Sequence, residues 1–385
     1  MRDNFVQISE GLLDKLATSY SKIQPTTTGL KKSIMDCIYP IREYFKQNNF
    51  HNYDLQKQGP NHKIVKDCSI ITENKIIKTK VSLYRPVTKK GDPRIWISKL
   101  NDYCQANDEL SLIIREGQLF VINLSKYNFE QISNSSTDNE IKNFLKDGKN
   151  NDEIADELFN KIEKIAKLGF IKGNKGDKEV GELLERKLNI RANSDKKPDY
   201  KGIEIKASHN TKTRNNLFAQ VPDFKHPLSK IERSSEIAEI YGYKKDGVSV
   251  LRNTIKYSKP NTQGLFFKIN YDDQLLIETC NKKNKPKDFA IWTFKKLQER
   301  LEEKHKKTFW VKAEKKIING AQHFKYTKVD YTSNPNTHLF FDLIEKDIVT
   351  MDHLIKGKKE KGPLFKIFPK NIQKLIPKVF SKSLI

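Results

Sequence analysis

Hydrophobic and polar positions in the amino-terminal third of the chain predict a compact unit in which helices precede strands. Apolar residues recur at helical spacing over residues 12–20, behind Ser9 as a candidate N-cap. Residues 34–45 form a second apolar segment of helical character, which Pro40 should kink or interrupt. The period changes to two over residues 77–83, where apolar and polar residues alternate as they do in a half-buried strand.

The next segments predict the last strands of this unit and the linker that follows it. Residues 94–97 predict a further strand, and residues 110–124 predict a hairpin with Glu116-Gly117 as its turn. The polar segment 131–151, rich in Ser, Asn and Asp, has the composition of a linker. We therefore expect an α+β domain over 1–128, a linker over 129–151 and a second domain over 152–385.

Helix-like and strand-like segments alternate in the second domain. Amphipathic patterns predict helices over residues 152–168, 177–188 and 289–305. The strand-like runs are residues 202–207, 217–221, 248–255, 265–269, 275–278 and 309–313. The segment contains no internal repeat and no long low-complexity tract, so we expect all of it to fold.

The strongest chemical signal is the run Pro-Asp-Tyr-Lys-Gly-Ile-Glu-Ile-Lys that ends at Lys206. Successive side chains of a strand point to opposite faces, so Ile203 and Ile205 should face the core. Glu204 and Lys206 should then project together, next to Asp199 at the entrance of the strand. Two carboxylates beside an ammonium group suit Mg²⁺, which prefers a few carboxylate oxygens and completes its shell with waters and substrate phosphate. Such a site can activate a water and stabilise charge on a scissile phosphate.

The bare pattern Asp-x4-Glu-x-Lys also arises by chance in a chain with 31% charged residues, where an ordinary surface strand is the alternative. Two neighbouring segments favour the chemical interpretation. Upstream, the helical run Gly-Glu-Leu-Leu-Glu carries Glu185, with Leu184 and Leu188 toward the core, as a candidate third carboxylate. Downstream, residues 217–223 (LFAQVPD) predict the neighbouring strand.

The charge of the chain favours a polyanionic partner. The formal net charge is +24, and residues 151–385 contribute 49 basic and 31 acidic side chains, a net +18. Neutralising phosphates with such side chains releases counterions, which makes nucleic acid the first candidate. A surface that is merely well solvated is the alternative that composition leaves open.

Other classes of protein are disfavoured by what the sequence lacks. No run approaches 18 apolar residues, so a membrane span is excluded, and the first residues do not have the pattern of a secretory signal. The four cysteines lie far apart without a Cys-x-x-Cys pair, which argues against a zinc ribbon or a disulfide scaffold. We expect a cytoplasmic protein. No phosphate-loop motif occurs, so an ATP-driven translocase is not supported.

Taken together, these motifs resemble the MvaI/BcnI type II restriction endonuclease family. The resemblance lies in the Pro-Asp-x4-Glu-x-Lys strand, the Gly-x-x-Leu-Glu helix before it and the LFAQVP segment after it. It continues through the runs IEKIAKLGFI, SKPNTQGLFFKIN, FWVKAEK, HFKYTKVDYT and LFFDLIEKD, which follow the order of the family. The similarity covers about residues 153–385.

The resemblance implies a PD-(D/E)xK nuclease fold, a mixed sheet flanked by helices, which cleaves double-stranded DNA with Mg²⁺. Asp199 and Glu204 match the metal-binding carboxylates, and Lys206 matches the catalytic lysine. Glu185 matches the glutamate of the Leu-Glu helix that assists at the metal, although Glu182 lies one turn away. Family members act as monomers, and a modification methyltransferase is the expected partner within the restriction system.

The resemblance is weaker where the DNA sequence is read. Family members carry an Arg-Asp-His-Gly run near the carboxyl terminus, and Lys-Glu-Lys-Gly, which contains Lys359 and Lys361, stands in the corresponding place here. The recognition sequence therefore cannot be carried over. Both lysines belong to a basic carboxyl-terminal segment that suits phosphate contacts. Lys212 and Arg214 are further candidates for DNA contacts, with solvated surface charge as the alternative.

We therefore expect a Mg²⁺-dependent, site-specific double-strand endonuclease. The alternatives are a strand-specific nicking enzyme of the MutH kind, a DNA-binding protein without catalysis, and an RNA-directed nuclease, which is disfavoured because no RNA-stacking motif is present. The amino-terminal domain is a candidate DNA-binding effector, by analogy with relatives that carry such an addition. Residues 88–94 would supply a basic loop for that role. A stabilising or oligomerising extension is the alternative.

Overall fold

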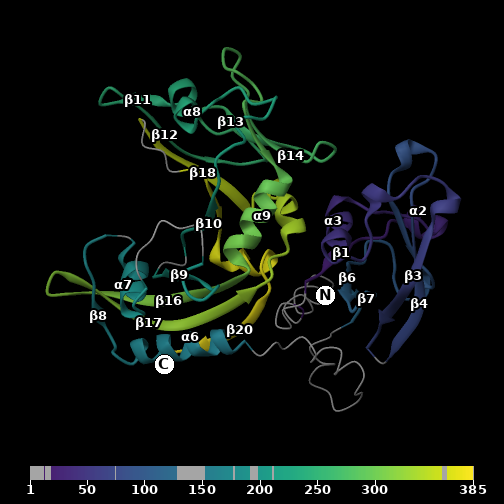
Figure 1. The fold of residues 1–385 in the computed structure, drawn as a ribbon, viewed down its shortest axis with the longest axis horizontal. Coiled ribbons are helices and arrows are strands. Elements are labelled where there is room, and N and C mark those ends of the chain that lie inside the picture. Colours follow the sequence, from purple (N-terminus) through teal and green to yellow (C-terminus); the bar gives the residue numbers. More distant parts are fainter. Residues whose placement is uncertain are drawn as a thin grey trace. The chain divides into compact units, whose positions relative to one another are not determined.

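A computed structural model gives the three-dimensional structure of the chain (Figure 1). It describes Leu13 and residues 19–73, 75–127, 152–176, 178–190, 198–209, 212–357 and 362–384, without the side chain of Lys89. The chain forms two compact units, Met1–Asn151 and Asp152–Ile385. Most of the helix expected at 12–20 and the linker expected at 131–151 lie outside the described residues.

The first unit is built on a seven-stranded sheet with the order β1-β6-β7-β3-β4-β5-β2. Its strands are β1 (Ser21–Ile23), β2 (Met35–Asp36), β3 (Ile64–Ile71), β4 (Ile76–Tyr84), β5 (Arg94–Ile97), β6 (Leu110–Arg115) and β7 (Gln118–Asn123). β3 and β7 pair in parallel, and the other neighbours are antiparallel. The predicted strands at 77–83 and 94–97 and the hairpin at 110–124 are therefore confirmed.

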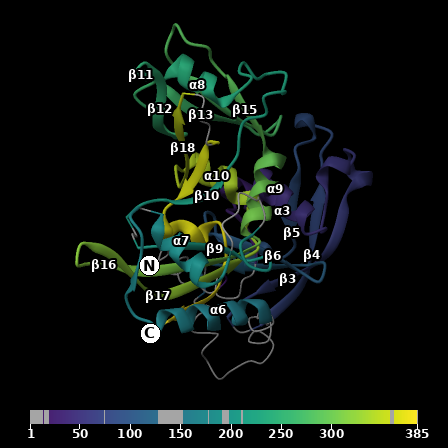
Figure 2. The ribbon, with the colours of Figure 1, turned by 60° about the vertical axis from the view of Figure 1, so that its left-hand side comes forward.

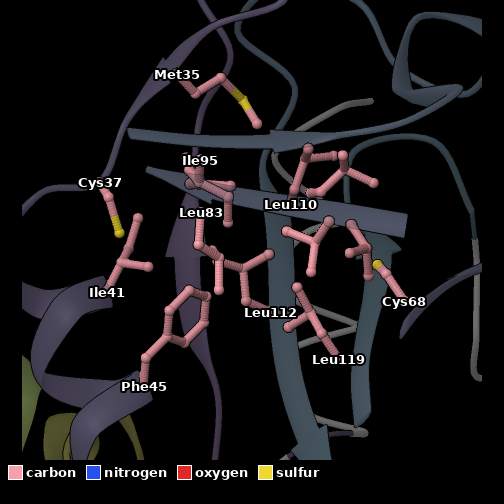
Figure 3. Close-up of a cluster of buried hydrophobic side chains, with 14 of the residues drawn as sticks. Met35, Cys37, Ile41, Phe45, Cys68, Leu83, Ile95, Leu110, Leu112 and Leu119 are labelled. Atoms are coloured by element: carbon pink, nitrogen blue, oxygen red, sulfur yellow. The ribbon is translucent and has the colours of Figure 1, made fainter. Parts of the chain in front are cut away.

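The helices α2 (Thr27–Lys32) and α3 (Tyr39–Gln47) accompany this sheet. The expected helix over 34–45 was wrong at its start, because Met35 and Asp36 form β2 and α3 begins only at Tyr39. Pro40 occupies the first turn, where its missing N–H costs no hydrogen bond. Phe45 of α3 packs into a buried cluster with Leu83, Leu112 and other apolar side chains of the sheet (Figure 3).

The described residues of the second unit form three sheets. The first has the order β20-β17-β16-β9, with β8 added beside β17, and is mixed because β9 pairs in parallel with β16. Its strands are β8 (Ile171–Lys172), β9 (Glu204–Ser208), β16 (Lys307–Ile318), β17 (Ala321–Ser333) and β20 (Lys378–Ser383). The second has the order β10-β19-β18-β12-β11, and the third has the order β13-β14-β15. Their strands are β10 (Asn215–Ala219), β11 (Tyr243–Lys245), β12 (Val248–Ile255), β13 (Leu265–Asn270), β14 (Leu275–Cys280), β15 (Ala290–Thr293), β18 (Val349–Lys356) and β19 (Leu364–Ile367).

Helices flank these sheets (Figures 1 and 2). They are α6 (Glu153–Ala166), α7 (Glu179–Lys187), α8 (Ser234–Tyr241), α9 (Phe294–His305) and α10 (Phe340–Glu345). α6 and α7 pack their apolar faces on the sheet that contains β9, in one buried cluster that includes Leu158, Leu184 and Phe309. This mixed sheet with flanking helices is the expected restriction-endonuclease architecture, preceded by a sheet-rich amino-terminal unit.

Two expectations about the second unit were wrong. Residues 289–305 do not form one helix, because Ala290–Thr293 form β15 and the side chain of Thr293 then caps α9 by accepting the N–H of Lys296. The segment at 217–223 is not the neighbour of the β9 strand. β10 pairs with β19 in another sheet, and β16 is the strand that neighbours β9. Among the helices that the structure describes, none combines the length and the apolar character that a membrane span requires.

Candidate active site

A tight turn brings Asp199 back over the start of β9. Tyr200 and Ile203 exchange backbone hydrogen bonds of 2.9 and 2.7 Å, and Gly202 between them has a φ of +90°, which glycine adopts without strain. Asp199 is held in place because its Oδ2 accepts the backbone N–H of Ile205 at 2.9 Å. The carboxylate of Asp199, which the sequence placed at the entrance of the strand, therefore lies beside the first residues of β9.

The alternation of β9 separates a buried core face from a charged face, as the sequence predicted. Ile203 and Ile205 belong to the core cluster under α6 and α7. On the other face, Lys206 Nζ donates a hydrogen bond to Glu204 Oε1. Glu204 is more deeply placed than a surface strand residue would be, with 0% of its surface exposed, whereas a third of the Lys206 side chain is open to solvent. The two groups meet at the edge of the buried core.

A second lysine, which sequence reasoning did not find, also contacts Glu204. Lys304 lies in the last turn of α9, and its Nζ is 2.7 Å from Glu204 Oε2. Both oxygens of this buried carboxylate are thus paired with ammonium groups. The only sequence signal for Lys304 is its place in the last turn of an amphipathic helix, which does not indicate a partner on β9.

Glu185 joins the same electrostatic cluster from α7. Burial raises its pKa most, followed by the negative charge of Asp199, while the positive charge of Lys206 lowers it. Leu184 beside it is fully buried, as expected from the helical pattern. The structure therefore brings together all four residues that the sequence singled out, from a helix, a turn and a strand.

Burial and mutual repulsion make the ionised carboxylates of this cluster electrostatically unfavourable. Burial raises the pKa of Asp199, the charge of Glu204 raises it further, and the Ile205 N–H and the ammonium groups of Lys206 and Lys304 act in the opposite direction. Because the folded-state pKa lies above the ordinary value, the folded protein binds this proton more tightly than the unfolded chain does. The contribution to stability is present at low pH and is lost as pH rises through the folded-state pKa.

We expect Asp199→Asn to raise the melting temperature of the metal-free protein at neutral pH. The amide removes the buried negative charge, and its oxygen can still accept the Ile205 N–H. Each kcal/mol of relieved repulsion should raise the melting temperature by about 2–4 °C, and the gain should shrink as pH falls through the carboxyl range. Thermal unfolding in EDTA measures this, with Asp156→Asn as control, because Asp156 is an exposed residue of α6. A lower melting temperature for Asp199→Asn would contradict the expectation.

The donor set fits a hard divalent cation. Asp199 and Glu204 are close enough for the charge of Glu204 to raise the pKa of Asp199, and one or two carboxylates are what Mg²⁺ commonly takes from a protein. Two ammonium groups already lie against Glu204, so the carboxylates are arranged around positive charge. Within the described part of the chain, no three His, Cys, Asp or Glu side chains form a ready-made metal cage. Asp199 and Glu204 would hold the ion.

Of the residues expected to contact DNA, the structure describes Lys212 and Arg214, and both lie outside β9. Lys212 is exposed in the loop between β9 and β10. Arg214 takes part in a polar network on the sheet of β10, β12, β18 and β19: its Nη2 donates to Asp352 Oδ1 at 3.0 Å, and Lys366 Nζ lies 2.8 Å from Asp352 Oδ2. Lys359 and Lys361 lie outside the described residues.

Comparisons with known proteins agree with this architecture. The model of the MvaI/BcnI restriction endonuclease family matches residues 159–376, more than half of the chain. Among solved structures, a restriction endonuclease MvaI–cognate DNA substrate complex matches with a TM-score of 0.54 and 22% sequence identity, over 61% of this chain and 100% of MvaI. MvaI in the absence of DNA matches with a TM-score of 0.36 and 21% identity, over 60% and 100% of the two chains. No curated protein matches the chain.

The family match spans the elements that build the charged cluster. It begins within α6, includes α7, β9 and α9, and ends beyond β19. The match to MvaI at this level of identity establishes the fold, and the match to the family model establishes membership. The chain belongs to the MvaI/BcnI restriction endonuclease family.

Proposed function

We propose that this protein is a type II restriction endonuclease that hydrolyses phosphodiester bonds of double-stranded DNA at a short recognition sequence with Mg²⁺. The observation that carries the proposal is the cluster of Asp199, Glu204 and Lys206 at the start of β9, in a chain of this family. The relative MvaI has been solved in complex with its cognate DNA substrate, which supports duplex DNA as the substrate here.

The residues of the cluster have separable roles in this proposal. A bound Mg²⁺ would lower the pKa of a water and offset charge on the scissile phosphate. Asp199 and Glu204 hold the cation, and the Ile205 N–H keeps the Asp199 carboxylate in place. Lys206, partly open to solvent, presents its ammonium group to the attacking water or to the developing oxyanion. Glu185 assists from α7.

Cleavage of a sequenced genome-scale duplex, followed by mapping of the ends, tests the proposal. We expect double-strand breaks that recur at one short sequence, require Mg²⁺ and disappear in EDTA. Nicked circles as the final product of a plasmid digest would instead favour a MutH-like nicking enzyme. Binding of duplex DNA without any metal-dependent hydrolysis would favour a non-catalytic DNA-binding protein, and ends at random positions would contradict site specificity.

We expect a monomer in the cytoplasm, a cognate methyltransferase as its system partner, and phosphate or base contacts by Lys212, Arg214, Lys359 and Lys361. Arg214 would approach DNA from the Asp352 network, where its guanidinium is already oriented.

We also propose that the amino-terminal unit is a DNA-binding effector. The turn Lys89–Gly91, between β4 and β5, presents the exposed Lys90. Two side-chain hydrogen bonds hold this turn in place. Arg85 Nε donates to Gly91 O at 2.8 Å, and Gln58 Nε2 donates to Lys90 O at 3.2 Å. A basic turn held in one conformation suits contact with a phosphate.

Lys90→Ala should weaken DNA binding by the full-length protein and reduce its dependence on salt. Loss of one phosphate contact lowers the slope of log affinity against log salt concentration by about one. Fluorescence anisotropy across a salt series measures this slope, with Lys32→Ala on α2 as the control. An unchanged slope for Lys90→Ala would favour a stabilising or oligomerising role for the unit.

A further inference from the structure

The last residue of helix α9 fixes the end of the helix to β10 and β16. His305 is buried, its Nε2 is 2.8 Å from the backbone oxygen of Leu217, and its Nδ1 is 2.9 Å from Thr308 Oγ1. Its ring also stacks on Trp310 of β16. Thr308 is the residue of β16 that lies opposite Glu204 in the parallel pairing with β9. The end of α9 and the carboxylate of Glu204 are therefore built on the same short piece of sheet.

This anchoring places Lys304, which precedes His305, against one oxygen of Glu204. Its side chain is only 14% exposed, and its Nζ is 2.7 Å from Oε2. Lys206 contacts the other oxygen, Oε1, from the neighbouring position of the strand. The two lysines differ in setting, because Lys206 is partly open to solvent and Lys304 is largely enclosed. Lys206 can leave Glu204 for a substrate, whereas Lys304 is held where it is.

We propose that Lys304 is a positioning residue of the active site. It pairs with Oε2 of Glu204 and thereby keeps Oε1, the oxygen that contacts Lys206, available to a metal ion. This inference rests on the proposed function. A carboxylate that coordinates a metal is commonly oriented by a partner outside the metal shell, and loss of such a partner weakens metal binding about 10- to 100-fold. Here that partner is the ion pair with Lys304, because Oε2 accepts no hydrogen bond within the described residues.

Removal of Lys304 can change the affinity for a cation in two opposite directions, so the direction that is measured tests the proposal. If the ammonium group acted only as a nearby positive charge, its removal would tighten the binding of a cation. If it orients Glu204, its removal weakens that binding. We therefore expect Lys304→Met to bind Mn²⁺ about 10- to 100-fold more weakly than the wild type.

The experiment compares full-length wild type, Lys304→Met, Lys304→Arg and Lys295→Met. Lys295 lies on the same helix but is 82% exposed and pairs with Glu299, so its variant serves as the matched control. Mn²⁺ binding is followed by electron paramagnetic resonance, and cleavage by kcat and KM for duplex DNA. We expect Lys304→Met to lose Mn²⁺ affinity and kcat with KM unchanged, and Lys304→Arg to recover much of both. Equal or tighter Mn²⁺ binding by Lys304→Met would overturn the proposal.

A second measurement does not depend on metal or activity. In EDTA, Lys304→Met should lower the melting temperature by a few degrees when Glu204 is present and by much less in a Glu204→Gln background. An equal loss in both backgrounds would show that Lys304 stabilises the fold without acting through Glu204 and would overturn its role. A wild type that binds no Mn²⁺ and cuts no DNA would overturn the proposed function instead. The difference in melting temperature between the two backgrounds would still measure the interaction of Lys304 with Glu204.

Discussion

Replacing Glu204 by Gln is expected to reduce Mg²⁺-dependent DNA cleavage by about 10³-fold or more. The substitution keeps the size of the side chain but removes the negative charge that Lys206 and Lys304 now compensate. A metal ion contributes several kcal/mol to the transition state of phosphodiester hydrolysis, and each 1.36 kcal/mol changes a rate about tenfold. First-order rates on a plasmid that carries the mapped recognition site measure the loss.

Glu163→Gln is the matched control for this variant. Glu163 lies on α6, is partly exposed and pairs with Lys167 on the same helix, so the same chemical change is made away from the cluster. We expect its cleavage rate to equal that of the wild type. A Glu204→Gln protein that cuts at nearly the wild-type rate would remove Glu204 from the metal site.

Replacing Lys206 by Ala should slow cleavage by about 10²–10³-fold while leaving DNA binding nearly unchanged. Removal of one donor that stabilises a developing oxyanion typically has an effect of this size. Binding should persist because one ammonium group is a small part of a domain whose formal charge is strongly positive. Single-turnover cleavage with Mg²⁺ and anisotropy with Ca²⁺ separate the two properties.

Lys201→Ala provides the comparison, since Lys201 precedes the same strand but pairs with Glu157 on α6. If Lys206→Ala cut as fast as Lys201→Ala, the assigned role of Lys206 would be wrong. If Lys206→Ala lost DNA binding and cleavage in proportion, the ammonium group would act in binding and not in the chemical step.

Local patterns predicted well which of these side chains lie together, because the residues are close together in the sequence. The alternation of β9 is enough to place Ile203 in the core and Glu204 beside Lys206. Helical spacing likewise places Leu184 in the core and leaves Glu185 toward the cluster. Periodicity of two or of 3.6 decides which side chains share a face, and no distant partner is needed for that step.

Long-range pairing could not be predicted in the same way. The alternation of residues 217–221 is compatible with any neighbouring strand, and only the fold shows that β10 pairs with β19 while β16 lies beside β9. Lys304 was missed for the same reason, because nothing near it in the sequence specifies Glu204 as its partner. In residues 289–305 the apolar residues fit a strand or a helix equally, and the Thr293 cap divides them.

The position of a bound metal ion tests the account most directly. Crystals of the full-length protein soaked with Mn²⁺ would show it by anomalous scattering at the manganese edge. We predict one strong peak within coordination distance of carboxylate oxygens of both Asp199 and Glu204, which is absent from Glu204→Gln crystals. A peak at other residues, or none at a Mn²⁺ concentration that supports cleavage in solution, would contradict it.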